Sequence, residues 1–570
     1  MKNIINQRIY IIYFLIIISL LGLDIRLIYL QVFAAKELKE KAQLQQQYVV
    51  KLASKRGLIT DRNGHELAVD VQSYSIFIEG ANINISKPEI ANKLSSVLKE
   101  DKHELLKKLN SIGNHWSWIK RKVDQNIAKK ITDLKIKGIG VLPESKRVYP
   151  KNNLAASLIG FTGSENQGLS GIELSFDKFL MEGGNKITII KDALGNEVLR
   201  KTSDNVPLLT SKVDANKVIL TIDETIQYIV ERELTKGIEE FQAERGLGIV
   251  MDILNGDILA LATIPSFDPN KYEESNWKNI KNWAVTDFYE PGSTMKIFSI
   301  AAALETRNLK VDEVIECPGA IKVGKWIVHD HGNPPTRYLK PIEIIEVSSN
   351  VGVSKITRRI PPEQHRNLLE RFGFGHSTQS GLSGEVSGIL PPLPWDPVRQ
   401  STISFGQGIA VTPLQIVSAM SAIANNGIRV SPHVIQKIIS PKGEVIREFK
   451  STQTKVLSLY TANKMREMMI QVVQKGTGTG THIPGYVIGG KTGTADKVVK
   501  GYYNGEVMSS FIGIVPADKP RLIIFVLLDS PKKAHFASIT AVPIFKEISY
   551  NILLYLNIPP SKPEELLEKK

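Results

Sequence analysis

The sequence predicts an α/β multidomain protein with a single N-terminal transmembrane helix, an elongated α+β module and a C-terminal unit in which helices flank a sheet. Three observations lead to this prediction. The chain has 570 residues, which is too long for one hydrophobic core. A run from Ile9 to Leu23 carries no charge. Beyond about residue 217, strand-like segments lie at both ends of the remaining sequence with helical segments between them, which favours one sheet built from both ends of that segment.

The N-terminal apolar run is predicted to cross a membrane. Continued to Leu30, it spans twenty-two residues, about the length that a bilayer requires. Asp24 and Arg26 would then lie near the far interface, where charges cost less than at the centre. No small-x-small cleavage site follows the run, so we favour an anchor over a cleaved signal peptide. Residues 1–34 are assigned to a short tail and this anchor, and basic residues on both sides leave its orientation open.

Residues 35–215 are predicted to form a non-catalytic α+β module. The segment 56–70 places Asn63-Gly64 between two apolar runs, which is typical of a β-hairpin. Residues 85–112 show helical spacing of apolar side chains, and a second pair of strands is expected around Gly195-Asn196. No obvious cluster of catalytic residue types appears in this part of the sequence.

The C-terminal unit is predicted over residues 216–558, with a short charged tail at 559–570. A strand from Lys217 leads into a long helix that Asp223 caps, and a hairpin follows with its turn at Asn255-Gly256. A helical middle extends to about residue 480. Three strands and an amphipathic final helix then follow, at 486–495, 509–517, 521–529 and around Ile544, Ile548 and Ile552.

The composition is that of an ordinary folded protein. Hydrophobic residues make up 42% of the chain and charged residues 23%. Cys317 is the one cysteine, so no intrachain disulfide can form. The net charge of +14 comes without a long basic block and indicates a basic surface that suits an anionic lipid or polymer. No motif supports nucleic-acid binding, and we expect no nucleic-acid partner.

A helix start at residues 290–304, EPGSTMKIFSIAAAL, holds a serine and a lysine one turn apart. Pro291 and Gly292 are turn residues, and a spacing of three puts Ser293 and Lys296 on the same helix face. A serine hydroxyl is a weak nucleophile that needs a nearby base, and a buried lysine close to other cations can be that base. An isolated S-x-x-K, however, is more often a capped helix with a surface lysine.

Two further motifs change that interpretation. Ser348-Ser349-Asn350 is an S-x-N, and Lys491-Thr492-Gly493-Thr494 is a K-T-G-T. Ser348 lies 55 positions after Ser293, and Lys491 lies 143 positions after Ser348. The motifs are expected at a helix start, in a loop between helices and on a strand. Chance is a poor explanation for all three in this order.

Together the motifs resemble the set found in penicillin-binding proteins and serine β-lactamases. Segments 56–64, 147–150 and 168–180 resemble boxes of the N-terminal module of class B penicillin-binding proteins, and ATIPSFDPN, SSNVG and SFGQGIAVTPLQ resemble parts of their transpeptidase domain. The resemblance covers nearly the whole chain. It implies a pedestal or dimerisation-type module followed by a penicillin-binding, β-lactamase-like domain with an antiparallel sheet.

The resemblance also implies catalytic roles. Ser293 would be the nucleophile and Lys296 its base. Ser348 would pass a proton to the leaving amine, and Asn350 would hold the lysine and bind a peptide amide of the substrate. Lys491 would supply positive charge close to the site.

Substrate binding is implied for the remaining motif residues. The hydroxyls of Thr492 and Thr494 would bind a substrate carboxylate, and Gly493 would let the acyl chain lie close to the strand backbone. The backbone N–H groups of Ser293 and Thr494 would form the oxyanion hole. No cofactor is implied.

The predicted function is a serine-type peptidoglycan D,D-transpeptidase that cross-links stem peptides at the septum during cell division. Ser293 would attack the penultimate D-alanine carbonyl of one stem, release terminal D-alanine and pass the acyl group to an amine on a neighbouring stem. β-Lactams would acylate the same serine. SSNVG, with FGFG at Phe372 and LSGEVSG at Leu382, resembles the division-type (FtsI-like) enzymes, whereas elongation-type enzymes usually carry S-x-D.

The family resemblance also settles an orientation that local charge leaves open. It implies a single-pass protein of the cell (inner) membrane with a cytoplasmic N-terminus and a catalytic domain on the periplasmic or extracellular side. The sequence contains no polymerase module, so a SEDS-type (FtsW-like) glycosyltransferase and other division proteins are the expected partners.

Several alternatives were weighed beside this function. An elongation-type transpeptidase is the nearest, and a non-enzymatic division scaffold would tolerate loss of Ser293 or Lys491. A β-lactam sensor would add membrane spans and an H-E-x-x-H zinc protease, which the sequence lacks. A β-lactamase needs a deacylating base, but Glu385 stands in LSGEVSG without the asparagine of the class A loop, and we expect it to cap a neighbouring backbone N–H. No metal is predicted: a structural or surface role is expected for His329-Asp330-His331, because a third ligand is not evident.

Overall fold

The computed structural model describes residues 2–36, 38, 47–48, 55–113, 115–181, 187–191, 197–202, 215–499 and 502–567. The chain divides into two compact units. One consists of Met1–Lys55 with Gly183–Val213, and the other of Arg56–Glu182 with Asp214–Lys570.

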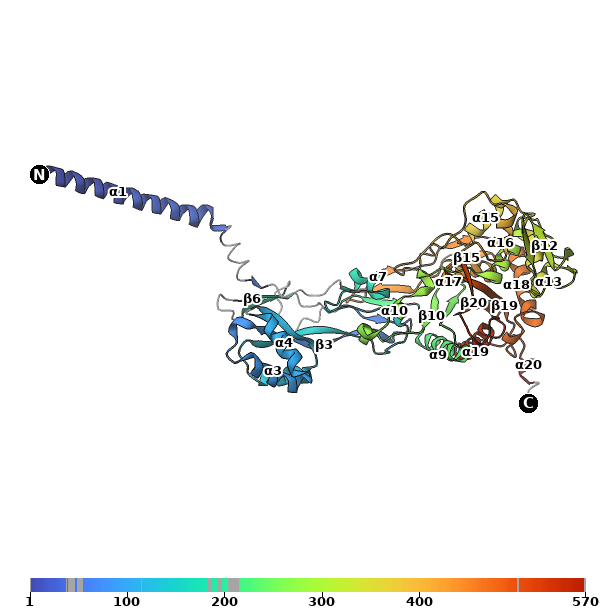
Figure 1. Ribbon diagram of the computed structural model, residues 1–570, viewed down its shortest axis with the longest axis horizontal. Helices are drawn as coiled ribbons and strands as arrows, with labels where there is room; N and C mark the ends of the chain where they lie inside the picture. The colour runs from blue at the N-terminus through green and yellow to red at the C-terminus, as the bar shows by residue number, and fades with distance from the viewer. Residues whose placement is uncertain are drawn as a thin grey trace. The chain divides into compact units, whose positions relative to one another are not determined.

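The first unit contains the predicted apolar helix. Helix α1 (Lys2–Ile28) runs into a π-helical turn, η1 (Tyr29–Phe33), as Figure 1 shows. Its segment Tyr10–Phe33 has a mean hydropathy of 2.4 and is long and apolar enough to cross a membrane. The unit also holds a three-stranded antiparallel sheet of β1 (Gln47–Tyr48), β6 (Ile187–Lys191) and β7 (Glu197–Thr202). The second predicted pair of strands is therefore confirmed, while its turn at Gly195-Asn196 lies outside the described residues.

The second unit begins with the predicted hairpin. Strand β2 (Ile59–Thr60) pairs with the long strand β3 (Glu66–Glu79) around Asn63-Gly64. Strand β3 also pairs with β4 and β5, and three amphipathic helices bury their apolar faces against this sheet. These elements are β4 (Trp116–Val123), β5 (Ile139–Val148), α3 (Lys87–Leu98), α4 (Lys102–Ile112) and α5 (Gln125–Asp133). Asp101 caps α4 by accepting hydrogen bonds from the N–H groups of His103 and Glu104.

The three N-terminal sequence boxes meet in one buried ion network. Arg56 is fully buried and pairs with Glu173 and with Asp177, the latter at 2.6 Å. Arg147 pairs with the same Glu173 at 2.7 Å and with Asp70 at 3.1 Å. Because each buried charge has an opposite partner, the network is tolerated, and removing one member would typically cost about 3–5 kcal/mol. The boxes are therefore explained by structure rather than by chemistry on a substrate.

One sheet joins this module to the rest of the unit. Strand β2 pairs in parallel with β8 (Lys217–Leu220), which pairs with β16 (Ile435–Ile439), and β17 (Val445–Glu448) completes the edge. The boundary predicted at residue 216 falls immediately before β8, a strand that pairs with strands on both of its sides in the sequence.

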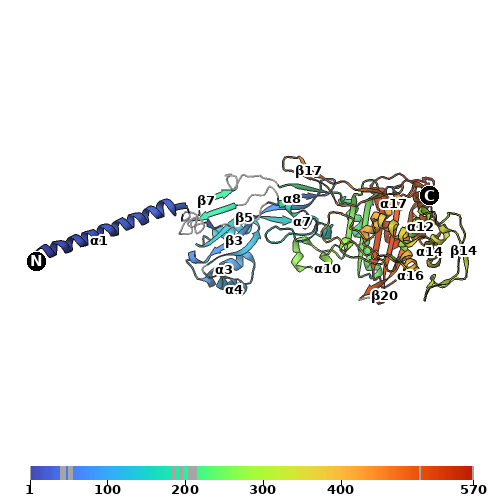
Figure 2. The same ribbon diagram turned by 90° about the horizontal axis from the view of Figure 1, so that it is seen from above.

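The predicted sheet built from both ends of the C-terminal segment is confirmed, and all of its pairs are antiparallel. Its strand order is β10 (Ile258–Ile264), β9 (Arg245–Asp252), β21 (Leu522–Asp529), β20 (Tyr502–Val515) and β19 (Gly489–Val499). Alternate residues of the strands belong to two separate cores. Helices α9 (Glu224–Phe241) and α19 (Ala541–Tyr555) cover one face, and α12 (Met295–Glu305), α17 (Pro413–Ala424) and α18 (Leu459–Lys475) cover the other. Figure 2 shows α12 and α17 over the sheet that contains β20.

The helix cap and the hairpin predicted near the start of this segment are also confirmed. Asp223 caps α9 by accepting hydrogen bonds from the N–H groups of Thr225 and Ile226, and β9 and β10 form the hairpin around Asn255-Gly256. Cys317 is buried and free.

A helical lobe follows α12 in the sequence. Its helices are α13 (Pro341–Glu346), α14 (Asn350–Thr357), α15 (Pro362–Arg371) and α16 (Pro397–Ser404). Three small antiparallel strand pairs accompany them: β11 (Ile315–Cys317) with β14 (Arg337–Leu339), β12 (Ala320–Val323) with β13 (Trp326–His329), and β15 (Ile428–Val430) with β18 (Gln453–Lys455). The remaining short helical segments are η2 (Gly80–Asn82), α6 (Ala156–Ile159), α7 (Gly171–Ser175), α8 (Asp177–Met181), η3 (Pro269–Glu274), α10 (Trp277–Ile280), α11 (Trp283–Thr286), η4 (Gly292–Thr294), η5 (Thr479–Thr481) and α20 (Glu564–Leu567).

Candidate active site

Ser293 lies at the helix start that the sequence predicts. The turn η4 leads directly into α12, whose apolar residues are buried. Gly292 has φ +55, and a Cβ on it would lie 2.9 Å from the carbonyl oxygen of Thr494. Glycine is needed here because of both the left-handed backbone and the close approach of strand β19.

Lys296 is buried one helical turn beyond Ser293. Its exposed fraction is 1%, and its Nζ donates to the carbonyl oxygen of Ser348 at 2.5 Å and to the Ser348 hydroxyl at 3.1 Å. Burial lowers the pKa of Lys296 well below its usual value, and the positive charge of Lys491 lowers it further, while Asp330 opposes both. This amine is therefore far more often neutral at pH 7 than an exposed lysine, as a base for the serine must be.

The S-x-N turn presents Ser348 in a strained conformation. Ser348 has φ +57 in the loop between α13 and α14. Ser349 caps α14 by accepting from the N–H of Gly352 at 2.9 Å, which fixes the turn from its other side. Backbone strain of this kind persists where surrounding contacts hold it, and it is frequent in active sites.

Asp330 supplies those contacts, and sequence reasoning missed this role. Its carboxylate accepts from the Ser349 hydroxyl at 2.7 Å, from the N–H of Val351 at 2.9 Å and from Arg337 at 2.9 Å. Asp330 is thus a structural residue, as expected when it was considered as part of a metal site. No sequence signal connects it with a turn nineteen positions later, because the link is a tertiary contact.

Asn350 has a partner that the resemblance did not imply. Its side-chain nitrogen donates to the carbonyl oxygen of His329 at 3.1 Å. The hydrogen bonds of Lys296 go instead to Ser348. Asn350 is therefore anchored to the backbone of the β13 segment, and its contact with Lys296 stays a prediction.

Lys491 is fully buried on strand β19. Its Nζ donates to the carbonyl oxygen of Thr492 at 3.1 Å and to the Thr492 hydroxyl at 3.2 Å. That hydroxyl also makes a 2.8 Å hydrogen bond with the hydroxyl of Thr477. Burial lowers the pKa of Lys491 to about 7, so the charge that it presents changes near neutral pH.

Gly493 lets strand β19 pack against the turn that carries the serine. A Cβ on Gly493 would lie 2.8 Å from Cγ2 of Thr294 and 2.6 Å from the hydroxyl of Ser510. Close packing is therefore a second reason for glycine at this position, in addition to the predicted approach of an acyl chain. It also brings the segments of Ser293 and Thr494 together, as an oxyanion hole shared between their N–H groups requires.

Two further contacts fix the rim of the site. Thr494 accepts from the N–H of Ala537 at 3.3 Å, which ties the loop after β21 to the K-T-G-T strand. Glu290, three residues before Ser293, accepts from the N–H of Gly408 at 2.7 Å and from the Tyr503 hydroxyl at 3.1 Å. Sequence reasoning did not identify Glu290, because its partners lie more than a hundred positions away.

Glu385 has the structural role predicted for it. Its carboxylate accepts from the N–H groups of Thr378 at 2.6 Å and Ser380 at 3.2 Å, and from the hydroxyls of both residues. The side chain is thus used in closing its own loop.

One group of possible metal ligands lies elsewhere among the described residues. Ligand atoms of Asp61, His65 and Glu224 lie within 4.8 Å of one another. The Asp61 carboxylate, however, accepts from the N–H groups of His65 at 2.8 Å and Glu224 at 3.1 Å. This group is explained by turn and helix capping.

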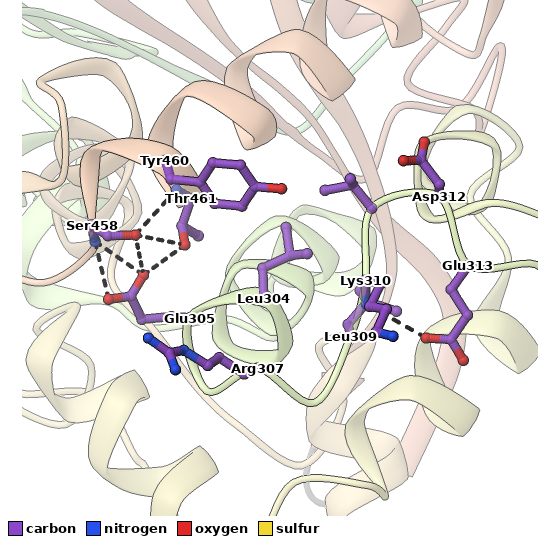
Figure 3. Close-up of a pocket in the computed structure, with 11 residues that line it drawn as sticks. Leu304, Glu305, Arg307, Leu309, Lys310, Asp312, Glu313, Ser458, Tyr460 and Thr461 are labelled. Atoms are coloured by element: carbon purple, nitrogen blue, oxygen red, sulfur yellow. Dashed lines mark hydrogen bonds between the residues drawn. The ribbon is translucent and has the colours of Figure 1, made fainter.

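A pocket of about 820 Å³ lies at the other end of α12 (Figure 3). Its wall includes Glu305, which accepts from the N–H and hydroxyl of Ser458 and from the hydroxyl of Thr461. A helix of this length separates the pocket from Ser293 by roughly 15 Å. The reactive motifs therefore lie outside it.

Comparison with known proteins decides the family. The model of the penicillin-binding protein transpeptidase domain matches residues 246–550, and that of the penicillin-binding protein dimerisation domain matches residues 51–209. The chain belongs to the class B penicillin-binding proteins. The predicted family and the enzyme class, a D,D-transpeptidase, are confirmed.

Relatives of this class B protein match along nearly its full length. The probable peptidoglycan D,D-transpeptidase PenA of Neisseria meningitidis is 33% identical over 98% of this chain and 94% of its own. The peptidoglycan D,D-transpeptidase FtsI of Buchnera aphidicola (subsp. Schizaphis graminum) is 32% identical over 98% and 96%. Stage V sporulation protein D of Bacillus subtilis is 33% identical over 97% and 86%.

Solved structures share the fold. A peptidoglycan synthetase from Bifidobacterium adolescentis superposes with a TM-score of 0.71 at 28% identity, covering 90% of this chain and 97% of that one. Penicillin-binding protein 3 of Mycobacterium tuberculosis, complexed with aztreonam, gives a TM-score of 0.69 at 27% identity, with coverages of 90% and 99%.

Proposed function

We propose that this protein cross-links peptidoglycan stem peptides at the division septum, with Ser293 as the acyl carrier. The observation that carries the proposal is the buried amine of Lys296, one helical turn from Ser293 and hydrogen-bonded to Ser348. A base with a lowered pKa beside a serine is what acyl transfer requires. The names of its relatives support peptidoglycan as the substrate.

The reaction has two balanced halves. In the first, Lys296 takes the proton of Ser293 while the serine oxygen bonds to the penultimate D-alanine carbonyl. Ser348 then relays a proton to the leaving amine, the peptide bond breaks, and D-alanine departs. In the second, an amine of a neighbouring stem attacks the ester, loses a proton by the same relay and restores the Ser293 hydroxyl. β-Lactams would enter the first half and remain as the ester.

The K-T-G-T strand would bind the donor. Lys491 and the hydroxyls of Thr492 and Thr494 provide positive charge and donors for the terminal carboxylate. The N–H groups of Ser293 and Thr494 would stabilise the oxyanion, and losing one such donor typically costs about 10²–10³ in rate. Asn350 would bind a peptide amide of the same stem.

The division role rests on a motif and on relatives. The sequence SSNVG resembles the division type, and several relatives carry the name FtsI. The N-terminus would be cytoplasmic, and the catalytic domain at 216–558 would lie on the periplasmic or extracellular side. A SEDS-type (FtsW-like) glycosyltransferase would polymerise the glycan.

Penicillin labelling tests the chemistry. The intact protein should gain the mass of one penicillin at Ser293, and Ser293→Ala should abolish the label while the fold is kept, because one small oxygen is removed. Labelling that survives at another residue would overturn the assignment.

Depletion of the protein in cells tests the proposed role in division. Filaments that lack septa support the division role, whereas rounded cells would assign the protein to elongation.

A further inference from the structure

The hairpin of β12 and β13, residues 320–331, has an exposed apolar surface. Trp326 and Ile327 are 69% and 68% exposed. Two large apolar side chains left exposed on one short hairpin mark an interaction site more often than scattered single ones do. The hairpin is packed against α14 and lies at the edge of the helical lobe, where Figure 1 labels β12.

The strand register defines the exposed face. Lys322 lies opposite Ile327 and Ala320 opposite His329, and all four are exposed, whereas Val323 and Val328 point inward and are buried. Lys325 is exposed in the turn beside Trp326. The exposed side chains therefore gather around the turn, with Lys322 and Ile327 on one face of the hairpin and Trp326, which pairs with Val323, on the other.

The positive charges of this surface face solvent. Lys322 and Lys325 take part in none of the ion pairs found among the described residues. The acidic residue of the hairpin, Asp330, is buried and bound by Arg337 and the Ser349 hydroxyl. The surface therefore suits an anionic partner with apolar faces.

The hairpin ends at the reactive motifs. The carbonyl of His329 accepts from Asn350, and Asp330 holds the S-x-N turn. The ring of His331 contacts the ring of Phe536, with 5.2 Å between centroids. Phe536 precedes Ala537, whose N–H donates to Thr494 of the K-T-G-T strand. The base of the hairpin therefore contacts the S-x-N turn directly, and it is connected to the K-T-G-T strand through Phe536 and Ala537.

We propose that this hairpin binds the glycan and stem peptides next to the reacting stem, an anionic glycopeptide polymer. The inference rests on the proposed function. Aromatic rings such as Trp326 offer flat apolar faces to sugar rings, and the lysines would pair with free stem carboxylates. An extended stem of five residues spans about 17 Å, so the glycan of a bound stem stays near the serine. This nearness, with the unpaired charge, favours the polymer over a protein partner.

Co-sedimentation with purified, insoluble peptidoglycan sacculi tests the proposal on the full-length chain in detergent. The double variant Lys322→Glu/Lys325→Glu should bind sacculi about tenfold more weakly at low salt, with a smaller difference at high salt. Trp326→Ala should weaken binding at both salt concentrations, since its contact is apolar. Lys442→Glu/Lys519→Glu is the matched control: it changes the same charge at two exposed lysines in other turns and should bind as the wild type does.

Acylation by free penicillin distinguishes a failure of this inference from a failure of the proposed function. Lys322, Lys325 and Trp326 lie outside the three reactive motifs, so the variants should acylate within about twofold of wild type. Sacculus binding equal to that of wild type in both hairpin variants would overturn the inference. If these variants bound sacculi normally but caused a division defect in cells, the surface would be assigned to a protein partner instead. If the wild type itself is not acylated, the proposed function fails, and the inference with it.

Discussion

The amine of Lys296 lies 3.1 Å from the hydroxyl of Ser348 and 2.5 Å from the carbonyl oxygen of the same residue. One buried amine is thus held by a turn whose backbone is itself in the left-handed region. The proposed base and the proposed proton relay are therefore positioned together, and both depend on the contacts that hold the S-x-N turn.

Removing the base should slow acylation without unfolding the domain. Lys296→Ala is expected to acylate at least about 10²-fold more slowly with penicillin, since a general base contributes about that much. Stopped-flow labelling measures the rate, and circular dichroism checks the fold. A near-normal rate would mean that the base lies elsewhere.

Lys491 should give the rate a descending limb near neutral pH. Its pKa is lowered to about 7, so the charge that binds a substrate carboxylate is present below that pH and is lost as pH rises through it. The second-order acylation constant should fall above about pH 7. Lys491→Arg, which stays charged, should remove this limb even if its maximum is lower. Lys442→Arg serves as the control, and an unchanged limb in Lys491→Arg would contradict the assignment.

Asp330 should affect acylation in two ways, through the pKa of Lys296 and through its hydrogen bonds to the S-x-N turn. Its carboxylate raises the pKa of Lys296 against burial. Asp330→Asn should therefore move the acid limb of acylation to lower pH, and weaker hydrogen bonds to the turn should slow the plateau by about tenfold. If Asp330 acted only in folding, Asp330→Asn would lower the plateau of the acylation rate and leave its acid limb at the same pH. Asp312→Asn, at an exposed position, is the matched control.

Stability should depend on pH through Glu231. It accepts from the N–H of Ala155 at 2.7 Å, and burial raises its pKa to about 7 from an ordinary value of 4.5. The folded state thus binds its proton more tightly, and this contribution to stability is present below pH 4.5 and is lost as pH rises to about 7. As pH rises from 4.5 to about 7, the free energy of unfolding of Glu231→Gln should increase relative to that of wild type by roughly 1–3 kcal/mol. Urea unfolding at pH 4.5 and 8 measures it, and a constant difference would contradict the pKa shift.

The sequence predicts what depends on local pattern. The apolar strand segments of β9 and β21, the cap at Asp223 and the turn at Asn255-Gly256 all follow from neighbouring residues. It could not predict contacts made by residues distant in the chain, such as Asp330 with Ser349 or Arg56 with Glu173. The parallel pairing of β2 with β8 was missed for the same reason. Only the family resemblance brought the three motifs together, since spacing along a chain does not specify distance in space.

The lifetime of the penicilloyl ester should be independent of Glu385. Rapid hydrolysis needs a base that positions water beside the ester, and this carboxylate instead accepts from the N–H groups of Thr378 and Ser380. Glu385→Gln should leave the ester persisting for many minutes, as in wild type. It should also lower the free energy of unfolding by about 1–3 kcal/mol, because an amide group cannot accept on both sides as the carboxylate does. Mass spectrometry of the acylated protein over time measures the lifetime, and urea unfolding measures the stability. Turnover of free penicillin within seconds, lost in Glu385→Gln, would instead make this loop the deacylating machinery of a β-lactamase.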